Sequence, residues 1–234
     1  VKRGLKAGKH IFVEKPLALN RSELEELSQL YTALDKPPVL MVGFNRRYSP
    51  LIESLSQALK RKSQPVSMVM TVNAGEVPAD HWIHDIDVGG GRIIGECCHF
   101  IDLFRYLAKS PIVDVQSKKI NSACGDSVCI LLSFGNGSIG TVNYLANGNK
   151  GFPKERLEVF CGGSIAQVDN FRSLKVFGWP GLKSKRLWRQ DKGQSDCTKE
   201  FIRAIEQGDS SRLIPFDELY EVANACFDVM DQIS

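Results

Sequence analysis

The sequence lacks a long hydrophobic run and an excess of charge of either sign. Apolar runs such as Val128–Leu132 are far shorter than the roughly 20 residues that cross a bilayer, which excludes a membrane helix of that kind. The 30 basic and 27 acidic side chains leave a net charge of +3, so the composition gives no support to nucleic-acid binding. A chain of 234 residues with 43% apolar residues is instead long and hydrophobic enough to bury a large core.

The seven cysteines show no pattern of a disulfide framework or a zinc site. Their number is odd, no Cys-x-x-Cys pair occurs, and Cys97 and Cys98 are too close in sequence for an ordinary disulfide. Reduced thiols are typical of the cytosol. We therefore expect a soluble, cytoplasmic protein with free thiols.

Residues 1–72 carry alternating helix and strand patterns. A basic stretch that ends at Gly8 has the pattern of a helix C-terminus. Asn20 is the predicted N-cap of a second helix, with Glu23 three residues later, and Pro37-Pro38 ends that helix. The predicted strands lie at 11–13, 39–42 and 66–72, and Pro50 opens a further amphipathic helix.

The pattern changes after the glycine run Gly89-Gly90-Gly91. A helix follows, and its predicted buried residues are Phe100, Leu103, Phe104 and Leu107. Short β-rich runs then fill the chain from about 113 to 177, separated by turn sequences, and predict an antiparallel sheet. The expected runs are 127–134, 138–145, 156–160, 165–168 and 174–177. Two helices close the chain, the second of them strongly amphipathic.

Two motif matches lack the context that their chemistry requires. Gly135–Gly140 fits G-x-G-x-x-G, but it links two β-rich runs, so it predicts a hairpin turn and no phosphate site. A group of potential metal ligands has irregular spacing, unlike a zinc site, so we expect no metal. That group is His81, His84, Asp85, Asp87, Cys97, Cys98 and His99. A metal-dependent hydrolase using Glu96 with three of these histidines (81, 84 and 99) is an alternative that metal analysis would test.

Lys15 follows the strand 11–13, at the edge where open α/β sheets place their ligands. A lysine there serves in proton transfer or donates a hydrogen bond to a substrate hydroxyl; the alternative is a solvated lysine at a strand end. His99 shares a helix face with Glu96 and suits the role of base. The alternative is a packing histidine hydrogen-bonded to Glu96 or Asp102.

A second polar loop, Asn45-Arg46-Arg47, lies between a predicted strand and a helix start. Arginine side chains bind phosphate and carboxylate groups with two parallel hydrogen bonds, and strand-exit loops often carry function. The alternative is ordinary surface charge.

Three segments together resemble the Gfo/Idh/MocA family of nicotinamide-dependent oxidoreductases. They are residues 7–18 with Glu14-Lys15-Pro16, residues 43–50 with Asn45-Arg46-Arg47, and residues 89–103 with the glycine run and His99. The ending Ile214–Leu219 also resembles the family's penultimate loop and last helix.

The resemblance implies an α+β chain in two parts. Residues 1–43 would be the last part of a dinucleotide-binding Rossmann domain, and 44–234 a substrate-binding and oligomerisation domain. The second part would be a mostly antiparallel, open-faced sheet with helices on one face, like the C-terminal domain of dihydrodipicolinate reductase. The glycine-rich dinucleotide motif would lie upstream of Val1, so we expect the isolated chain to be inactive.

The resemblance also implies roles for individual side chains. Lys15 and His99 would be the catalytic groups, with His99 taking the substrate hydroxyl proton. The residues expected on the cofactor side are Glu14, Lys15, Pro16, Asn45 and Arg46 or Arg47. Those expected to bind substrate are Lys15, Trp82, His84, Glu96 and His99.

One position departs from the family pattern. Many members have Asp four residues before the histidine, where this sequence has Gly95 followed by Glu96. Glu96 is a candidate for the missing carboxylate, although a shift of one residue turns a helix side chain by about 100°. This form of the motif resembles a subset in which the module follows a zinc-type alcohol-dehydrogenase-like region.

The sequence therefore predicts an NAD- or NADP-dependent dehydrogenase acting on a sugar, nucleotide sugar or cyclitol. The alternative is a non-catalytic ligand-sensing or dimerisation module of the same fold. A homo-oligomer formed through the open sheet face is expected, since large apolar surfaces are rarely left in water.

Overall fold

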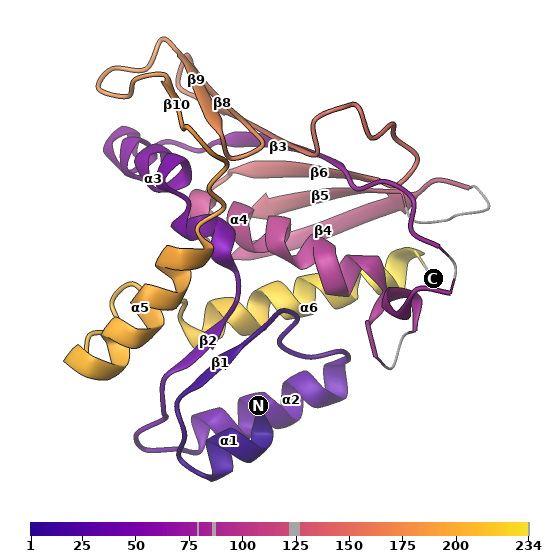
Figure 1. Cartoon of the computed structure of the whole chain (residues 1–234), viewed down its shortest axis with the longest axis vertical. Helices are drawn as coiled ribbons and strands as arrows, with labels where there is room; N and C mark the ends of the chain where they lie inside the picture. Colours follow the sequence, from indigo (N-terminus) through magenta and orange to yellow (C-terminus); the bar gives the residue numbers. More distant parts are fainter. Residues whose placement is uncertain (79, 86–87, 122–126, 234) are drawn as a thin grey trace.

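The computed structural model describes residues 1–78, 80–85, 88–121 and 127–233, except the side chain of His84. It contains a two-stranded parallel sheet and an eight-stranded mixed sheet, with helices packed between and around them (Figure 1).

The first part of the chain is a β-α-β unit preceded by a short helix. Its elements are α1 (Lys2–Lys6), β1 (Ile11–Val13), α2 (Arg21–Thr32) and β2 (Leu40–Val42). The predicted cap is confirmed, because the Glu23 backbone N–H donates to Asn20 Oδ1 at 2.9 Å. β1 and β2 pair in parallel, so their carboxyl ends lie side by side. The residues that follow them, Glu14-Lys15 and Gly43, therefore meet at one edge.

The next part of the chain is mostly helical and contributes the first strand, β3, to the large sheet. It comprises η1 (Asn45–Tyr48), α3 (Pro50–Lys62), β3 (Ser67–Asn73), η2 (Trp82–His84), η3 (Ile93–Cys97) and α4 (Cys98–Ala108). The predicted buried residues of α4 are confirmed: Phe100, Leu103, Phe104 and Leu107 are each at most 2% exposed. The sequence did not indicate that η3 is a π-helix.

The remaining strands are β4 (Ile112–Lys119), β5 (Val128–Phe134), β6 (Ile139–Leu145), β7 (Glu155–Cys161), β8 (Ser164–Asp169), β9 (Ser173–Phe177) and β10 (Lys185–Arg186). The sheet order is β10-β9-β8-β7-β3-β6-β5-β4. Neighbours are antiparallel except β3 and β6, so the sheet is mixed and not wholly antiparallel. The turn between β5 and β6 confirms that Gly135–Gly140 lies in a hairpin.

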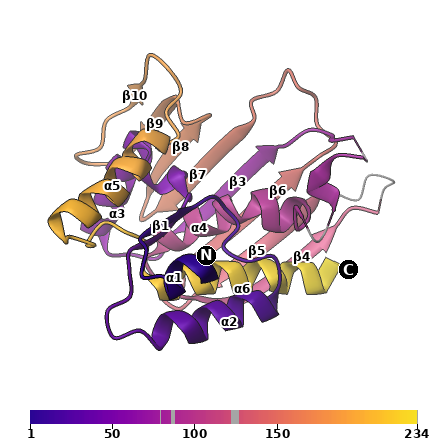
Figure 2. The same ribbon diagram turned by 60° about the horizontal axis from the view of Figure 1, so that its bottom comes forward.

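The two faces of the large sheet differ. Burial alternates along β5 to β8, as expected when only one face is covered. Figure 2 shows α4 and α6 (Phe216–Ile233) on the same face of the sheet. α5 (Gln194–Gln207) packs against η1. This places the chain in the α+β class, with one sheet face open among the described residues.

Two further observations concern the described ranges only. None of their helices combines the length and hydropathy needed to span a membrane. Their six cysteines are free thiols, and Cys124 lies outside the described residues.

Candidate functional site

A cavity of about 360 Å³ lies where the carboxyl ends of β1 and β2 meet η1, α4 and the start of α5. Its lining residues are Phe12, Glu14, Gly43, Asn45, Arg46, His99, Lys192, Gln194, Cys197 and Thr198. The structure thus brings together side chains from all three segments that carried the family resemblance. It adds Lys192 and the first turns of α5, which the sequence did not single out.

Lys15 lies directly after β1 and is half-buried. Its Nζ donates a hydrogen bond to the backbone carbonyl of Gly95 in η3. The Lys15–Pro16 peptide bond is cis. The contact with Gly95 joins the first family segment to the third and fixes the Lys15 ammonium near α4.

Gly95 occupies a position where a side chain has no room. A Cβ there would lie 2.6 Å from Ile83 Cδ1 and 2.9 Å from the Gly89 carbonyl oxygen. The Ile83 side chain and the Gly89 backbone therefore fill the space that an aspartate would need. At this position Lys15 binds a backbone carbonyl, where the family pattern would supply a carboxylate.

His99 lies in the first turn of α4 and packs edge to face on Phe44, with ring centroids 5.9 Å apart. Its Nδ1 is buried and has no hydrogen-bond partner among the described residues. Burial lowers the pKa of His99 well below its usual value, and the positive charges of Arg46, Lys15 and Lys192 lower it further. The imidazole is therefore neutral at pH 7, with a nitrogen available to a ligand.

The carboxylates near His99 in sequence contact other groups. Glu96 accepts from Arg92 Nε at 3.1 Å and from the hydroxyl of Tyr144. Burial raises the pKa of Glu96, but Tyr144 and Arg92 outweigh it and hold the pKa below its usual value. Glu96 is thus a paired carboxylate that does not line the cavity. Among the described residues, no hydrogen bond or ion pair joins it to His99.

Arg46 and Arg47 point to different places. Arg46 lines the cavity and binds Glu155 through Nε at 3.1 Å and Nη2 at 2.9 Å. Arg47 binds Asp102 at 2.6 Å and Glu218 at 3.0 Å, both outside the cavity lining. Of the two arginines considered from the sequence, Arg46 belongs to the site, and Arg47 ties α4 to α6.

A larger cavity of about 470 Å³ lies beside Arg47 and is also lined by Arg105 and Arg212. Arg105 pairs with Glu221 at 3.0 Å, and Arg212 pairs with Glu200 at 3.0 Å. These ion pairs and those of Arg47 engage its three arginines, and its fourth cation, Lys109, donates to the Ser56 carbonyl at 3.0 Å.

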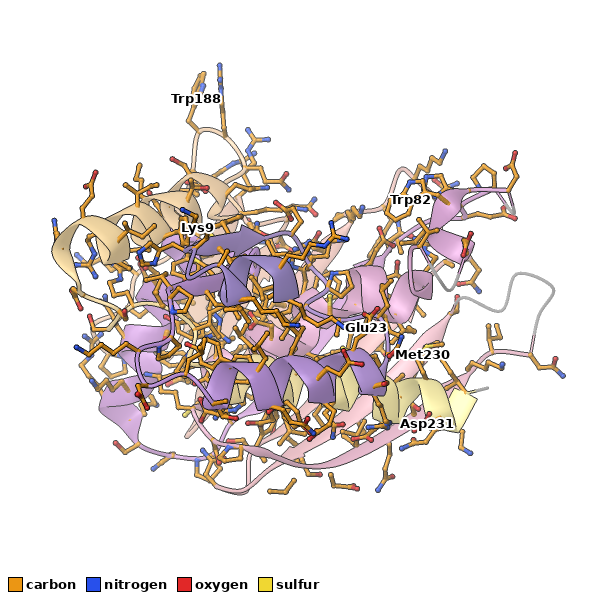
Figure 3. The ribbon with its side chains drawn as sticks, turned by 90° about the horizontal axis from the view of Figure 1, so that it is seen from below. Lys9, Glu23, Trp82, Trp188, Met230 and Asp231 are labelled. Atoms are coloured by element: carbon orange, nitrogen blue, oxygen red, sulfur yellow. The ribbon has the colours of Figure 1, made fainter. Side chains whose placement is uncertain are left out.

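Of the predicted substrate-side residues, Trp82 and Lys15 are not among those that line the cavity. Trp82 is 58% exposed, and Figure 3 shows it at the edge of the molecule opposite α5. The side chain of His84 and all of Asp87 lie outside the described residues. Among the residues that are described, no group of three or more His, Cys, Asp or Glu side chains is arranged to hold a metal ion.

The sequence missed Glu155 and Lys192, although both charges belong to the site. Glu155 is 1% exposed, and Lys192 Nζ lies 2.6 Å from its Oε1. Glu155 begins a strand of ordinary β pattern, and Lys192 lies in a polar linker. No local signal distinguishes either residue from a surface charge.

Comparison with known proteins is consistent with this arrangement. Residues 64–166 match the model of the GFO/IDH/MocA C-terminal domain. A myo-inositol 2-dehydrogenase of Thermotoga maritima is 27% identical over 179 residues, which are 73% of this chain and 52% of that protein. An inositol 2-dehydrogenase of Rhizobium meliloti is 25% identical over 223 residues, 89% of this chain and 66% of that protein.

Solved structures share the fold. A levoglucosan dehydrogenase in complex with NADH and levoglucosan has a TM-score of 0.79 at 20% identity, covering 98% of this chain and 72% of its own. A UDP-N-acetylglucosamine 3-dehydrogenase of Acidithiobacillus ferrooxidans has a TM-score of 0.76 at 21% identity, covering 99% and 73%. The chain spans about half the length of two of the curated relatives that it matches.

Proposed function

This chain carries a GFO/IDH/MocA C-terminal domain and so belongs to that family, and on that premise we propose that it supplies the substrate side of a nicotinamide-dependent dehydrogenase. The substrate would be a sugar, nucleotide sugar or cyclitol, in keeping with relatives named as inositol dehydrogenases. The observation that carries the proposal is His99, a buried neutral imidazole with an unpartnered nitrogen in a cavity at parallel strand ends.

The residues present fit the nicotinamide end of NAD or NADP. Open α/β sheets bind ligands at the carboxyl ends of their parallel strands, and Glu14, Gly43 and Asn45 line the cavity at those ends. A side chain at Gly43 would displace Glu14, because its Cβ would lie 2.9 Å from Glu14 Oε2. When bound there, the oxidised nicotinamide supplies a hydride acceptor. In this proposal residues 1–43 form the last part of the cofactor domain.

His99 would take the proton of the substrate hydroxyl as hydride leaves the same carbon. A neutral imidazole is competent for this at pH 7, although its low pKa makes it a weak base. The ammonium of Lys15 donates one N–H to the Gly95 carbonyl and would donate another to the hydroxyl oxygen. Positive charge beside a developing alkoxide lowers its proton affinity, so a weak base suffices.

The open sheet face supports self-association of the chain. One row of mostly apolar side chains crosses five paired strands of this face. In the order β6, β3, β7, β8 and β9, the row consists of Ile139, Ser67, Phe160, Ile165 and Phe177. Ile139, Phe160 and Phe177 are 46%, 41% and 55% exposed. A row of this kind is a poor surface to leave in water, and we expect a second copy of the chain to cover it.

The test uses the full-length gene product with NAD or NADP and a panel of sugars, nucleotide sugars and cyclitols, and follows the absorbance of the reduced nicotinamide. Lys15→Met and His99→Asn should each lower the rate by about 100-fold or more, because each removes a group acting in proton transfer. Lys9→Met changes an exposed lysine and is the matched control. If no substrate is oxidised while both variants bind sugars like the parent, the ligand-sensing module becomes the better account.

A further inference from the structure

Lys192 is built into the cavity by backbone contacts that are distant in sequence. Asn45 Nδ2 donates to the Lys192 carbonyl at 2.7 Å, and Ser49 Oγ donates to the Asp191 carbonyl at 2.8 Å. Gly193 has φ +84°, and a Cβ there would lie 2.5 Å from Ser49 N, so the linker lies directly on η1. The position of Lys192 is therefore determined by the fold of the site and is not that of a loose surface lysine.

The charges around His99 do not balance. Arg46 and Lys192 share one carboxylate, Glu155, at 2.9 and 2.6 Å. Lys15, the third cation that acts on His99, binds a backbone carbonyl. Glu14 precedes Lys15 at the end of β1 and lines the cavity with a solvent-exposed side chain. Among these described residues, the three cations around His99 therefore outnumber the two carboxylates, Glu155 and Glu14, by one.

Donors also remain available on these cations. Glu155 accepts hydrogen bonds from Nε and Nη2 of Arg46, so Nη1 of Arg46 stays available. The ammonium of Lys192 has three N–H groups and uses one of them on Glu155. His99 Nδ1, buried in the same cavity, lacks a partner among the described residues. The remaining N–H groups of Arg46 and Lys192 form a site beside His99 that a carboxylate or phosphate would complete, because such groups accept several charge-assisted hydrogen bonds.

We propose that the substrate carries an anionic group, a carboxylate or a phosphate, on the ring that is oxidised, and that Lys192 and Arg46 bind this group beside His99. The inference rests on the proposed function and names its substrate class. Glu155 is the counter-charge that holds both cations in place before substrate arrives. A neutral sugar or cyclitol would leave the surplus positive charge of the pocket uncompensated, and burying unpaired charge is costly.

The test is calorimetric binding of matched sugars to the protein. Glucose and glucuronate, and galactose and galacturonate, differ by one carboxylate, and glucose 6-phosphate supplies the phosphate arm. We expect at least one acidic member to bind tenfold or more tightly than its neutral partner. The anion, carboxylate or phosphate, that raises the affinity more over the neutral sugar is identified as the group that the site binds. The preference for the acidic sugar should vanish in Lys192→Gln and persist in Lys192→Arg. Because Lys192→Arg keeps the positive charge, this pair of results would show that the preference depends on that charge.

Lys175→Gln is the matched control, because Lys175 is exposed on β9 and lines no part of this cavity. Equal binding of acidic and neutral partners, or a preference that survives Lys192→Gln, overturns the inference. In either case the dehydrogenase proposal stands or falls by its own assay, in which nicotinamide reduction with a neutral sugar would support it. Failure of every probe to bind also overturns the inference.

Discussion

Glu155 shows how one buried carboxylate organises the site. Burial raises the pKa of Glu155, but the charges and hydrogen bonds of Arg46 and Lys192 outweigh it and hold the pKa below the usual value. Glu155 is therefore ionised at pH 7. A buried charge that loses its partner is destabilising by about 3 to 5 kcal/mol, since the remaining charges stay desolvated.

We expect Glu155→Gln to lower the free energy of unfolding by about 3 kcal/mol, because it leaves Arg46 and Lys192 without their shared counter-charge. Urea unfolding followed by circular dichroism measures the change. Glu158→Gln, on the same strand but on its open face, is the control. Equal losses in the two variants would show that the shared ion pair contributes nothing specific.

His99 links stability to pH. Its pKa is lower in the folded protein than the usual 6.5, so the unfolded chain takes up a proton first. Its contribution to stability is therefore present above about pH 6.5 and is lost as the pH falls from there toward the folded-state pKa. Burial raises the pKa of Asp102 to about 6, so the folded protein takes up this proton first as the pH falls below about 6. Protonation of Asp102 therefore increases stability at pH values where protonation of His99 decreases it.

Comparison with His99→Gln isolates the histidine, because Asp102 is present in both proteins. We expect the stability of the parent relative to His99→Gln to decrease below pH 6.5, with a slope approaching about 1.4 kcal/mol per pH unit. Urea unfolding at a series of pH values between about 5 and 8 gives this difference. A difference that is constant with pH would mean that His99 titrates normally in the folded protein.

The π-helix η3 (Ile93–Cys97) is the element that adapts the site to a missing aspartate. π-helical turns are rare and frequently occur at functional sites. Here η3 presents the Gly95 carbonyl to Lys15 and packs Gly95 against Ile83 and Gly89. Glu96, one residue later, turns toward Arg92 and Tyr144. The local backbone thus replaces a carboxylate by a carbonyl.

Restoring the family residue should therefore harm this protein. Gly95→Asp gains only a few tenths of a kcal/mol in helix propensity, whereas overpacking against the Gly89 carbonyl and Ile83 costs about 1 to 3 kcal/mol. We expect a net loss of about 2 kcal/mol in thermal or urea unfolding. Gly151→Asp, in an exposed turn, is the control. A Gly95→Asp protein as stable as the parent would show that Ile83 and Gly89 move aside at little cost.

Helix packing joins the small β-α-β unit to the elements of the large sheet, and among the described residues one face of that sheet is left open. Figure 3 shows α2 and α6 running side by side, with Glu23 on one and Met230 and Asp231 on the other. Arg21 of α2 pairs with Asp228 and Asp231 at 2.8 and 2.6 Å. These exposed pairs contribute little to stability, so buried leucines of α2 such as Leu24 and Leu27 provide most of the attachment.

If a second copy covers the open face, charges placed there should separate the copies. We expect sedimentation velocity to show an oligomer for the parent and a shift toward monomer for Phe160→Glu with Phe177→Glu. Both side chains lie in the exposed apolar row. Phe152→Glu is the control, because Phe152 is 51% exposed outside the strands. A parent that sediments as a monomer at all concentrations would contradict the expected association.

The sequence by itself determined the local features of this protein. The strands 127–134 and 138–145, the hairpin between them and the Asn20 cap were predicted within a residue or so. These features depend on neighbouring residues, through side-chain alternation, turn chemistry and capping. The same patterns placed Lys15 and His99 near strand and helix ends, where functional groups are common.

Only the tertiary structure decided which charges meet. Arg46 and Glu155 are 109 residues apart in sequence, and Asn45 and Lys192 are 147 apart, so no local pattern joins them. The parallel pairing of β3 with β6, the choice of Arg46 over Arg47 and the steric exclusion at Gly95 were also undetermined by the sequence. The physical reason is that long-range contacts depend on how the elements pack, whereas residue patterns specify only the elements themselves.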